Sequence, residues 1–333
     1  MGGTKGQKIR LLYLSDIFRK YTDEEHPLSA SELIEKLEEQ GIEVERKAIY
    51  NDISVLCEYG MDILKTRVPR SGYYLVSREF ETPEIYLLSD AVQAAGFISH
   101  KKTASLIKKL EDMLSRNQAR EIERRVYIDN RNKCANEEIF YNIDAATTAI
   151  SENKKINLTY CRRFIDENGK IAVSEKEMIV SPYALCWSGN HYYLVCNYEK
   201  YDNLMHLRLD RMKKVKTMSE NARHFSEVSE YKNYFDVADY AQKSFNMFGG
   251  QLKNVTLRCK RDLLEQIIDR FTDKINIKSL DDSHFSFTAK ALISDGLADW
   301  VMQFGKDVEV IEPQELREAV KKTAKEICGI YEK

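Results

Sequence analysis

Apolar residues recur at helical spacing in three stretches of the first sixty residues. The first, Lys8 to Lys20, carries apolar side chains on more than one face, so we expect a helix buried between its neighbours. The second follows Pro27, where Ser29 and Glu32 stand in a capping-box pattern and Gly41 ends the helix. Its buried stripe has the spacing i, i+3, i+4, i+7 and consists of Ala30, Leu33, Ile34 and Leu37.

A third helix is predicted from Arg46 to Tyr59, and its two faces differ in chemistry. The inner face is apolar and consists of Ile49, Ile53 and Leu56. The opposite face carries the donors and cations that read base edges and phosphates in a major groove: Arg46, Lys47, Tyr50, Asn51 and Ser54. Taken alone, such a face is equally typical of a solvated amphipathic helix.

The segment after this helix favours DNA binding. Val68 to Val76 has the pattern of a basic hairpin with a Ser-Gly turn signal, and it adds Arg70 and Tyr73 as candidate DNA contacts. From Ile63 to Arg78 the chain holds four basic residues and no acidic one. Two helices joined by a tight glycine turn and followed by a basic hairpin predict a winged helix-turn-helix over residues 1–80, with double-stranded promoter DNA as its partner.

Residues 81–137 are predicted to form a helical linker. Its helices are expected at Glu84–Ile98, Lys101–Leu114 and Gln118–Val126. The later part is basic, which indicates either a second DNA-facing surface or, as we expect, the charged outer face of a linker bundle. The apolar stretch from Ile85 to Ile98 is expected to pack between domains or across a dimer.

The hydrophobic period changes to two after a helix predicted at Asn142–Glu152. Ile156, Leu158 and Tyr160 alternate with polar residues, as in a strand with one buried face. Asp166-Glu167-Asn168-Gly169 is a hairpin-turn pattern. Further strands are expected at Met178–Cys186, His191–Tyr198 and Leu204–Met212. Four or five short antiparallel strands predict a small β-barrel of SH3-like or Sm-like type over residues 138–220.

A last domain is predicted over residues 251–333, after a linker at 221–250. Its strands are expected at Asn254–Cys259, as a pair within Ile275–Ala291, and at Val308–Ile311. Its helices are expected at Arg261–Phe271, Gly296–Phe304 and Pro313–Tyr331. This βαββαβα order predicts a split βαβ sheet packed on helices. The expected fold class is therefore α+β, in several domains.

Composition limits the class of protein. The chain has 333 residues, of which 43% are hydrophobic and 31% charged, as in a multidomain soluble protein. No run of 18 apolar residues predicts a membrane span, and the N-terminus lacks the apolar core of a signal peptide. Seven scattered cysteines without a CxxC pair favour reduced thiols, so we expect a cytoplasmic location. A net charge of −2 argues against coating nucleic acid by bulk charge, although locally sorted charge still directs one surface to a duplex.

Several motifs carry a resemblance to a known family. The segments 181–185 (SPYAL), 191–195 (HYYLV) and 207–212 (LRLDRM) resemble a WYL domain. The Trp-Tyr-Leu triplet of that family stands here as Tyr192-Tyr193-Leu194, which departs from the pattern at its first position but keeps an aromatic residue. Residues 300–310 and 312–317 are similar to the C-terminal extension often found behind WYL domains. The winged helix and residues 80–109 also resemble WYL-family regulators, so only 219–250 stands apart.

The resemblance implies that the WYL domain senses a nucleic-acid or nucleotide effector and that the last domain serves dimerisation or regulation. In the strand expected from Met205 to Arg211, Leu207 and Leu209 face one side, so Arg208 points away from the core. The rings and cations suited to holding such a ligand are Tyr183, His191, Tyr192, Arg208, Arg211 and Arg162. The tyrosines are equally expected to pack in or over the barrel, and Arg211 to pair with Asp210 or the preceding linker. We expect a homodimer whose two recognition helices enter successive major grooves.

Metal binding, catalysis and single-strand binding are the alternatives to a DNA-binding regulator. Cys186, His191, Cys196 and His206 have ligand chemistry, but their spacing fits no zinc knuckle, and no metal or cofactor is expected. The sequence holds no phosphate loop, nucleophile elbow, HExxH or dinucleotide-binding glycine motif, so no enzymatic activity is expected. An accessory defence-system protein that binds single-stranded nucleic acid without promoter binding stays open, because both proposed surfaces would serve single strands.

Overall fold

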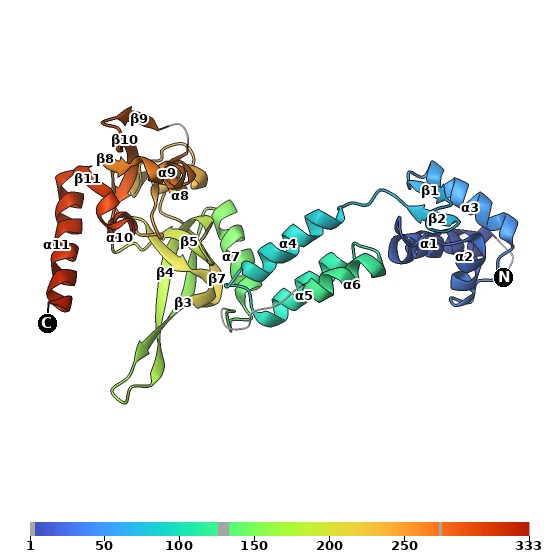
Figure 1. Ribbon diagram of the computed structural model, residues 1–333. Helices are drawn as coiled ribbons and strands as arrows, with labels where there is room; N and C mark the ends of the chain where they lie inside the picture. The colour runs from blue at the N-terminus through green and yellow to red at the C-terminus, as the bar shows by residue number, and fades with distance from the viewer. Residues whose placement is uncertain (1–3, 126–132, 273–274, 333) are drawn as a thin grey trace. The chain divides into compact units, whose positions relative to one another are not determined.

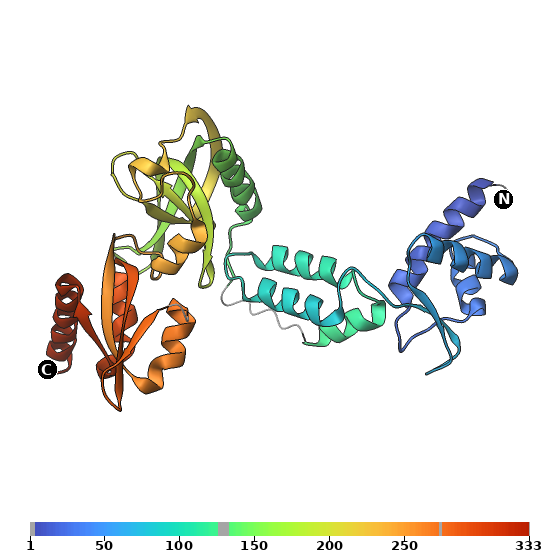
Figure 2. The same cartoon turned by 90° about the horizontal axis from the view of Figure 1, so that it is seen from above.

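A computed structural model describes residues 4–125, 133–272 and 275–332 of the chain. It divides into two compact units, Met1–Ala135 and Asn136–Lys333. The first is built of helices with one two-stranded hairpin, and the second is built around two antiparallel sheets (Figures 1 and 2). The expected α+β class is therefore confirmed.

Three helices and a hairpin form the N-terminal part of the first unit around one apolar core. The predicted capping box is present, because Ser29 accepts from the amide of Glu32 and the Glu32 carboxylate accepts from the amide of Ser29. Gly41 follows α2 with a φ of +73°, as predicted for the helix end. The elements are α1 (Thr4–Tyr21), α2 (Ala30–Glu38), α3 (Arg46–Glu58), β1 (Ile63–Thr66) and β2 (Gly72–Leu75).

A buried ion pair joins α1 to α3. Arg10 Nη2 donates to Asp52 Oδ1 at 2.9 Å, and Arg10 Nε donates to the other carboxylate oxygen. The Asp52 side chain is only 5% exposed, so Arg10 supplies the counter-charge that a buried carboxylate needs. The hydrogen bond to Asp52 also raises the pKa of Arg10. Together with the buried apolar side chains of α3, this ion pair fixes the orientation of α3 relative to α1.

The prediction that α1 is buried between neighbours is wrong for one face. Leu14, Ile17 and Phe18 lie in the core. Leu12 is 71% exposed, and Ile9 and Tyr13 beside it are also exposed. The reason is that, within the described part of this unit, α2 and α3 pack on only one side of α1.

The hairpin begins earlier than the sequence indicates. β1 pairs with β2 so that Lys65 lies opposite Tyr73, and residues 67–71 form the loop. The Ser-Gly pattern therefore marks the start of β2 and not the turn itself. Gly72 is required because a Cβ there would lie 2.8 Å from the backbone of Leu28, whose carbonyl accepts from the amide of Tyr73 at 2.7 Å.

The linker helices complete the first unit, close to the predicted ranges. α4 and α5 run side by side in opposite directions (Figures 1 and 2). The N-cap of α6, Ser115, donates to the buried Asp23 carboxylate at 2.5 Å and so ties the linker to the end of α1. In the predicted apolar stretch, Ile85 is buried but Leu87 is 71% exposed. The helices are α4 (Thr82–Ala94), α5 (His100–Glu111) and α6 (Arg116–Arg125).

A five-stranded antiparallel sheet opens the second unit, in the order β6-β5-β4-β3-β7 with α7 beside it. The predicted burial of Ile156, Leu158 and Tyr160 is confirmed. Strands β3 and β4 form a long hairpin that projects from the sheet (Figure 1) and turns at Gly169, with a φ of +74°. The elements are α7 (Ile139–Ser151), β3 (Lys154–Ile165), β4 (Ile171–Ser188), β5 (His191–Asn197), β6 (Met205–Arg208) and β7 (Met212–Asn221).

Two predictions for this sheet need correction. It is not a closed barrel, because β6 and β7 stay unpaired edges in the described residues, linked directly by the 3₁₀ turn η2 (Leu209–Arg211). The strand expected to reach Arg211 also ends earlier, at Arg208. Side chains from the start of the unit take the carbonyl groups that a longer strand would pair: Asn136 binds those of Asp210 and Met212, and Asn142 binds those of Leu209 and Met212.

The segment assigned to a linker, residues 221–250, is folded against the sheet. Four of its aromatic side chains form a cluster with Tyr183 of β4: Phe225, Tyr231, Phe235 and Tyr240. The segment contains the turn η3 (Phe225–Glu227) and helix α8 (Val237–Lys243). Its aromatic residues follow neither a helical nor an alternating period, which is why the pattern gave no sign of a packed element.

The last part of the second unit contains every element predicted for it. Its sheet has the order β11-β8-β10-β9, with all neighbours antiparallel. The core beneath it includes Phe271, Phe287 and Leu297. The elements are β8 (Gln251–Lys260), α9 (Leu264–Phe271), β9 (Asn276–Ser279), β10 (His284–Ile293), α10 (Asp295–Met302), β11 (Val308–Glu312) and α11 (Gln314–Tyr331).

His206 gives the second unit a testable dependence on pH. Its Nε2 lies 2.8 Å from the hydroxyl of Tyr240, and burial lowers its pKa from 6.5 to about 4. Between these values the unfolded chain takes up a proton that the folded chain does not. Stability should therefore fall with pH below 6.5, by at most about 1.4 kcal/mol per pH unit. Urea unfolding at pH 7 and pH 5 should show this loss, and it should shrink in His206→Gln; an equal loss in both proteins would contradict the assignment.

Candidate functional site

The predicted donor residues of α3 lie together on its exposed side. We call this set the α3 face: Arg46, Lys47, Tyr50, Asn51 and Ser54. Arg46 Nε donates to the Tyr50 hydroxyl at 2.9 Å, so two of its members hold each other in place. Ser54 Oγ donates to the Tyr50 carbonyl at 3.1 Å and keeps its lone pairs for other donors.

The hairpin continues this face through Tyr73. The Tyr73 ring lies 6.3 Å from the ring of Tyr50, and Lys65 Nζ lies 5.6 Å from the centre of the Tyr73 ring. Lys65 was not among the predicted contacts. Its place opposite Tyr73 depends on the β1–β2 register, although the basic, acid-free composition of the segment was a signal for it.

Two arginines of the hairpin region are held by the protein itself. Arg70 Nη1 donates to Glu32 Oε1 at 2.8 Å and remains half exposed. Burial alone would raise the pKa of Glu32, but hydrogen bonds from Ser29 and the charge of Arg70 lower it. The Arg78 guanidinium donates to the carbonyls of Arg19 and Thr22 at 2.8 and 2.6 Å. Arg78 therefore ties the end of the hairpin to α1. Because Glu32 partly neutralises Arg70, this arginine adds less positive charge to the hairpin surface than the sequence alone indicates.

In the second unit, Arg208 is paired with Asp210. Arg208 Nε donates to Asp210 Oδ1 at 3.0 Å and Nη2 donates to Oδ2 at 2.6 Å, which is a two-pronged arrangement. The sequence left open whether Arg211 pairs with Asp210 or with the preceding linker; in the structure this carboxylate binds Arg208. The Arg211 side chain is exposed.

Two rings border this pair on the same side of β5. Tyr193 lies opposite Arg208 in the β5–β6 register, and the His191 ring lies 6.2 Å from the Tyr193 ring. Burial lowers the pKa of His191, and the positive charges of Arg208 and Arg211 lower it further. His191 Nδ1 is buried without a hydrogen-bond partner among the described residues. His191 therefore has an unused ring nitrogen in a part of the site that is influenced by the positive charges of Arg208 and Arg211.

Strand β3 places one buried and one exposed side chain near Arg208. The Tyr160 hydroxyl accepts from the amide of Arg208 at 3.3 Å, and Tyr160 itself is buried. The Arg162 guanidinium lies 5.8 Å from the centre of the Tyr160 ring and is open to solvent. We call Tyr160, His191, Tyr193, Arg208 and Asp210 the Arg208 site, with Arg162 and Arg211 at its rim. The exposed cations Arg162 and Arg211 at the rim, beside the rings of His191 and Tyr193, suit a phosphate joined to a base.

Two predicted ligand residues lie outside the Arg208 site. Tyr183 is buried in the aromatic cluster, and its hydroxyl donates to the Arg223 carbonyl at 2.9 Å. Tyr192 points to the other face of β5 from Tyr193 and lies opposite Trp187. Tyr193 and Tyr160 were not among the predicted ligand residues, although alternation along β5 places His191 and Tyr193 on one face, and alternation along β3 places Tyr160 and Arg162 on one face.

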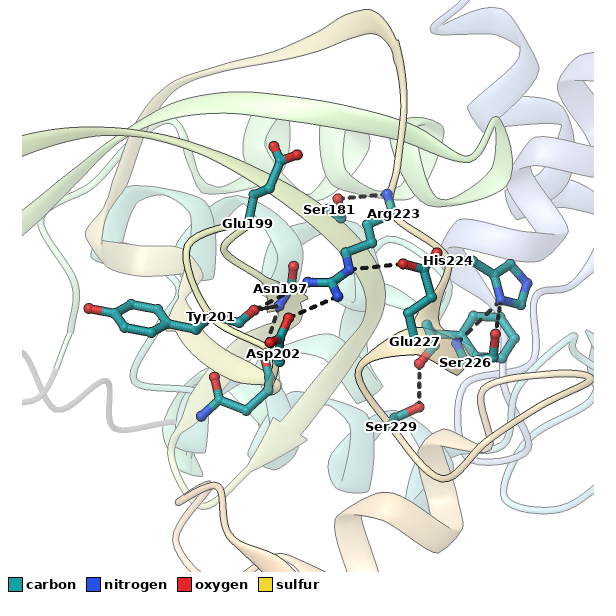
Figure 3. Close-up of polar contacts among 12 residues, drawn as sticks. Ser181, Asn197, Glu199, Tyr201, Asp202, Arg223, His224, Ser226, Glu227 and Ser229 are labelled. Atoms are coloured by element: carbon teal, nitrogen blue, oxygen red, sulfur yellow. Dashed lines mark hydrogen bonds and ion pairs between the residues drawn. The ribbon is translucent and has the colours of Figure 1, made fainter.

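A second polar cluster surrounds Arg223 (Figure 3). Its guanidinium binds Asp202 at 2.9 Å and Glu227 at 3.1 Å, and its amide donates to Ser181 Oγ at 2.9 Å. An open cleft of about 300 Å³ lies beside it, and Lys155 there pairs with two glutamates, Glu199 and Glu220. Because both cations are neutralised by carboxylates, this cluster serves to hold the loops together and is a poor site for an anion.

Metal and membrane chemistry find no support in the described residues. No group of three or more His, Cys, Asp or Glu side chains there is placed to hold a metal ion. No helix within the same ranges is long and apolar enough to cross a bilayer.

Comparisons with known proteins agree with the arrangement of the second unit. Residues 141–217 match the WYL domain, and residues 252–328 match the WCX domain. A comparison with curated proteins finds no match.

Among solved structures, the chain is similar to the proteasome accessory factor B/C (PafBC) of Arthrobacter aurescens, with 17% identity and a TM-score of 0.27 over 95% of this chain and 46% of that one. It is also similar to a CRISPR Cas-related protein, with 14% identity and a TM-score of 0.37 over 98% of this chain and 84% of that one. The chain thus spans less than half the length of the first. The resemblance seen in the sequence motifs is confirmed by the two domain matches: the chain carries a WYL domain followed by a WCX domain.

Proposed function

We propose that this protein is a DNA-binding transcription regulator whose WYL domain takes a nucleic-acid or nucleotide effector. It acts as a homodimer in which each α3 enters a major groove and the β1–β2 hairpin contacts the neighbouring backbone. The observation that carries the proposal is the continuity of the α3 face with the hairpin. Arg46 binds Tyr50, Tyr50 lies beside Tyr73, and Tyr73 lies beside Lys65, so the surface continues from α3 onto β2 and β1.

The chemistry of the α3 face supports duplex binding over a merely solvated helix. A solvated face needs no aromatic residues, yet Tyr50 is 39% exposed and contacts a second ring from the hairpin. Cations at Arg46, Lys47 and Lys65 supply phosphate neutralisation, and the amide of Asn51 suits an adenine edge.

The Arg208 site is the proposed effector site. Arg208 and Arg211 supply positive charge, Tyr193 supplies a ring, and His191 supplies an unpaired nitrogen. The cations at its rim, Arg162 and Arg211, are exposed, whereas Arg223 and Lys155 of the second polar cluster are both paired with carboxylates.

The effector proposal predicts a difference between two arginine variants. Binding of the full-length protein to duplex DNA from upstream of its own gene is measured by gel shift. Single-stranded oligothymidylate or cyclic nucleotides are expected to alter that shift, and Arg208→Ala should abolish the alteration while duplex binding remains. Arg163→Ala is the matched control. Arg163 is also exposed, but its side chain lies on the face of β3 opposite to that of Arg162. A shift that no ligand alters, or equal loss in both variants, would refute the effector site.

A further inference from the structure

The Asp210 carboxylate occupies the position that an anionic ligand of Arg208 would take. Its two oxygens bind Nε and Nη2 of the guanidinium at 3.0 and 2.6 Å. A phosphate binds arginine through the same parallel pair of N–H groups. The two side chains are 22% and 11% exposed, so the pair is shielded from water and Asp210 is a strong competitor for the site.

Asp210 lies on a turn that is tied to the beginning of the second unit. Asn136 Nδ2 donates to the Asp210 carbonyl at 3.1 Å and to the Met212 carbonyl at 2.8 Å. Glu138 follows Asn136 in the same segment, and its carboxylate accepts from the amide of Lys214 at 3.1 Å. A change in the backbone of η2 therefore acts directly on residues 136–138.

The same stretch of chain is anchored on its other side within the first unit. Lys133 Nζ donates to the carbonyls of Val92 and Ala95 at 3.1 and 3.0 Å, at the end of α4. The amide of Cys134 donates to the carbonyl of Gly96 at 2.9 Å. Ala135 alone separates the residues held by the first unit from Asn136. A connection of one residue has only two soft backbone dihedrals with which to absorb a movement of η2.

We infer that Asp210 is an internal competitor whose release from Arg208 reports effector binding to the DNA-binding unit. The inference rests on the proposed effector site. A phosphate at Arg208 displaces the Asp210 carboxylate and repels it, because two anions then compete for one guanidinium. The η2 turn shifts with Asp210, and Asn136 passes the shift to Lys133 and Cys134, which bind carbonyl groups at the end of α4 and just after it. The ligand thus favours one of two arrangements by removing a contact present in the other.

The first test needs no ligand. In full-length Asp210→Asn, which keeps the side-chain shape but loses the charge, amide exchange in residues 209–214 and 136–142 should quicken on the order of tenfold. Exchange in β8 and β10 should stay unchanged. Arg208→Lys breaks the two-pronged pair from the other side and should have the same effect, which keeps the test valid if Asp210→Asn does not fold. Exchange equal to that of the wild type in both variants would overturn the inference.

The second test decides whether Asp210 competes with the ligand for Arg208 or instead positions Arg208 for binding. Fluorescein-labelled decathymidylate is titrated into the wild type and Asp210→Asn, with inorganic pyrophosphate as a second probe. Removing a competitor should tighten binding about tenfold, as expected when the competent form rises from a minor to a major fraction. If Asp210 merely supported Arg208, binding would weaken, and the inference would fail. Absence of binding to either protein would refute the proposed effector class, while the exchange measurement still decides the role of Asp210.

Transmission is tested at Asn136. Asn136→Ala should bind decathymidylate at least as tightly as the wild type does, because the Arg208 guanidinium is kept while the turn that holds Asp210 loses two hydrogen bonds. Its duplex binding should no longer respond to the oligonucleotide. A response of wild-type size would show that the signal takes another route and would contradict the role given to Asn136.

Discussion

Replacing Arg46, Lys47 and Tyr50 together by alanine is expected to reduce duplex affinity by about 100-fold or more, because a bidentate base contact contributes about 1–3 kcal/mol and each phosphate contact adds further. Fluorescence anisotropy on promoter DNA at two or more salt concentrations measures the effect. Loss of Lys47 should also reduce the slope of log K against log salt by about 1.

The control for this variant removes a similar charge elsewhere. Lys321, Lys322 and Lys325 on α11 are exposed, and their triple alanine variant should bind duplex DNA nearly as the wild type does. If the two triple variants lost affinity equally, bulk charge would explain binding and the α3 face would have no special role. If duplex binding persisted undiminished in the α3 variant, promoter binding would fail as a function, and a role on single strands alone would take its place.

Arg10→Ala should be the most destabilising single substitution in the first unit. It leaves the Asp52 carboxylate, 5% exposed, without a counter-charge, which costs about 3–5 kcal/mol when a buried partner is removed. The free energy of opening, measured by native-state amide exchange in α3, reports this loss directly.

A surface ion pair on the same helix provides the comparison. Lys20 and Asp16 are 56% and 58% exposed, so Lys20→Ala should change stability by less than about 1 kcal/mol. Replacing both buried partners, in Arg10→Met with Asp52→Leu, should restore most of the lost stability, because no unpaired charge then remains. A small effect of Arg10→Ala would show that water reaches Asp52.

Local patterns were sufficient for the order of elements but not for their contacts. The capping box at Ser29, the end of α2 at Gly41 and the turn at Gly169 follow from side-chain and backbone preferences within a few residues. The α3 face could be read in the same way, because helical spacing alone decides which residues lie opposite Ile49 and Ile53. Lys65 could not, since its contact with Tyr73 needs the register of two strands.

The effector site shows where local reasoning stops. Tyr192 and Tyr193 are neighbours in sequence, and only the register of β5 decides which faces Arg208. A shift of one residue would exchange them. Burial of Tyr183 depends on the irregular segment after β7, which carries no periodic signal.

The sequence by itself determined the order of elements outside residues 221–250, the polar face of α3 and the WYL-like motifs, because periodicity, caps and turns act over a few residues. Only the tertiary structure decided that Asp210 binds the Arg208 guanidinium with both carboxylate oxygens. The physical reason is the turn at Leu209–Arg211, which forms because Asn136 and Asn142, 67 to 76 residues earlier, take carbonyl groups of the turn and of Met212. Such contacts join distant parts of the chain, and no local pattern encodes them.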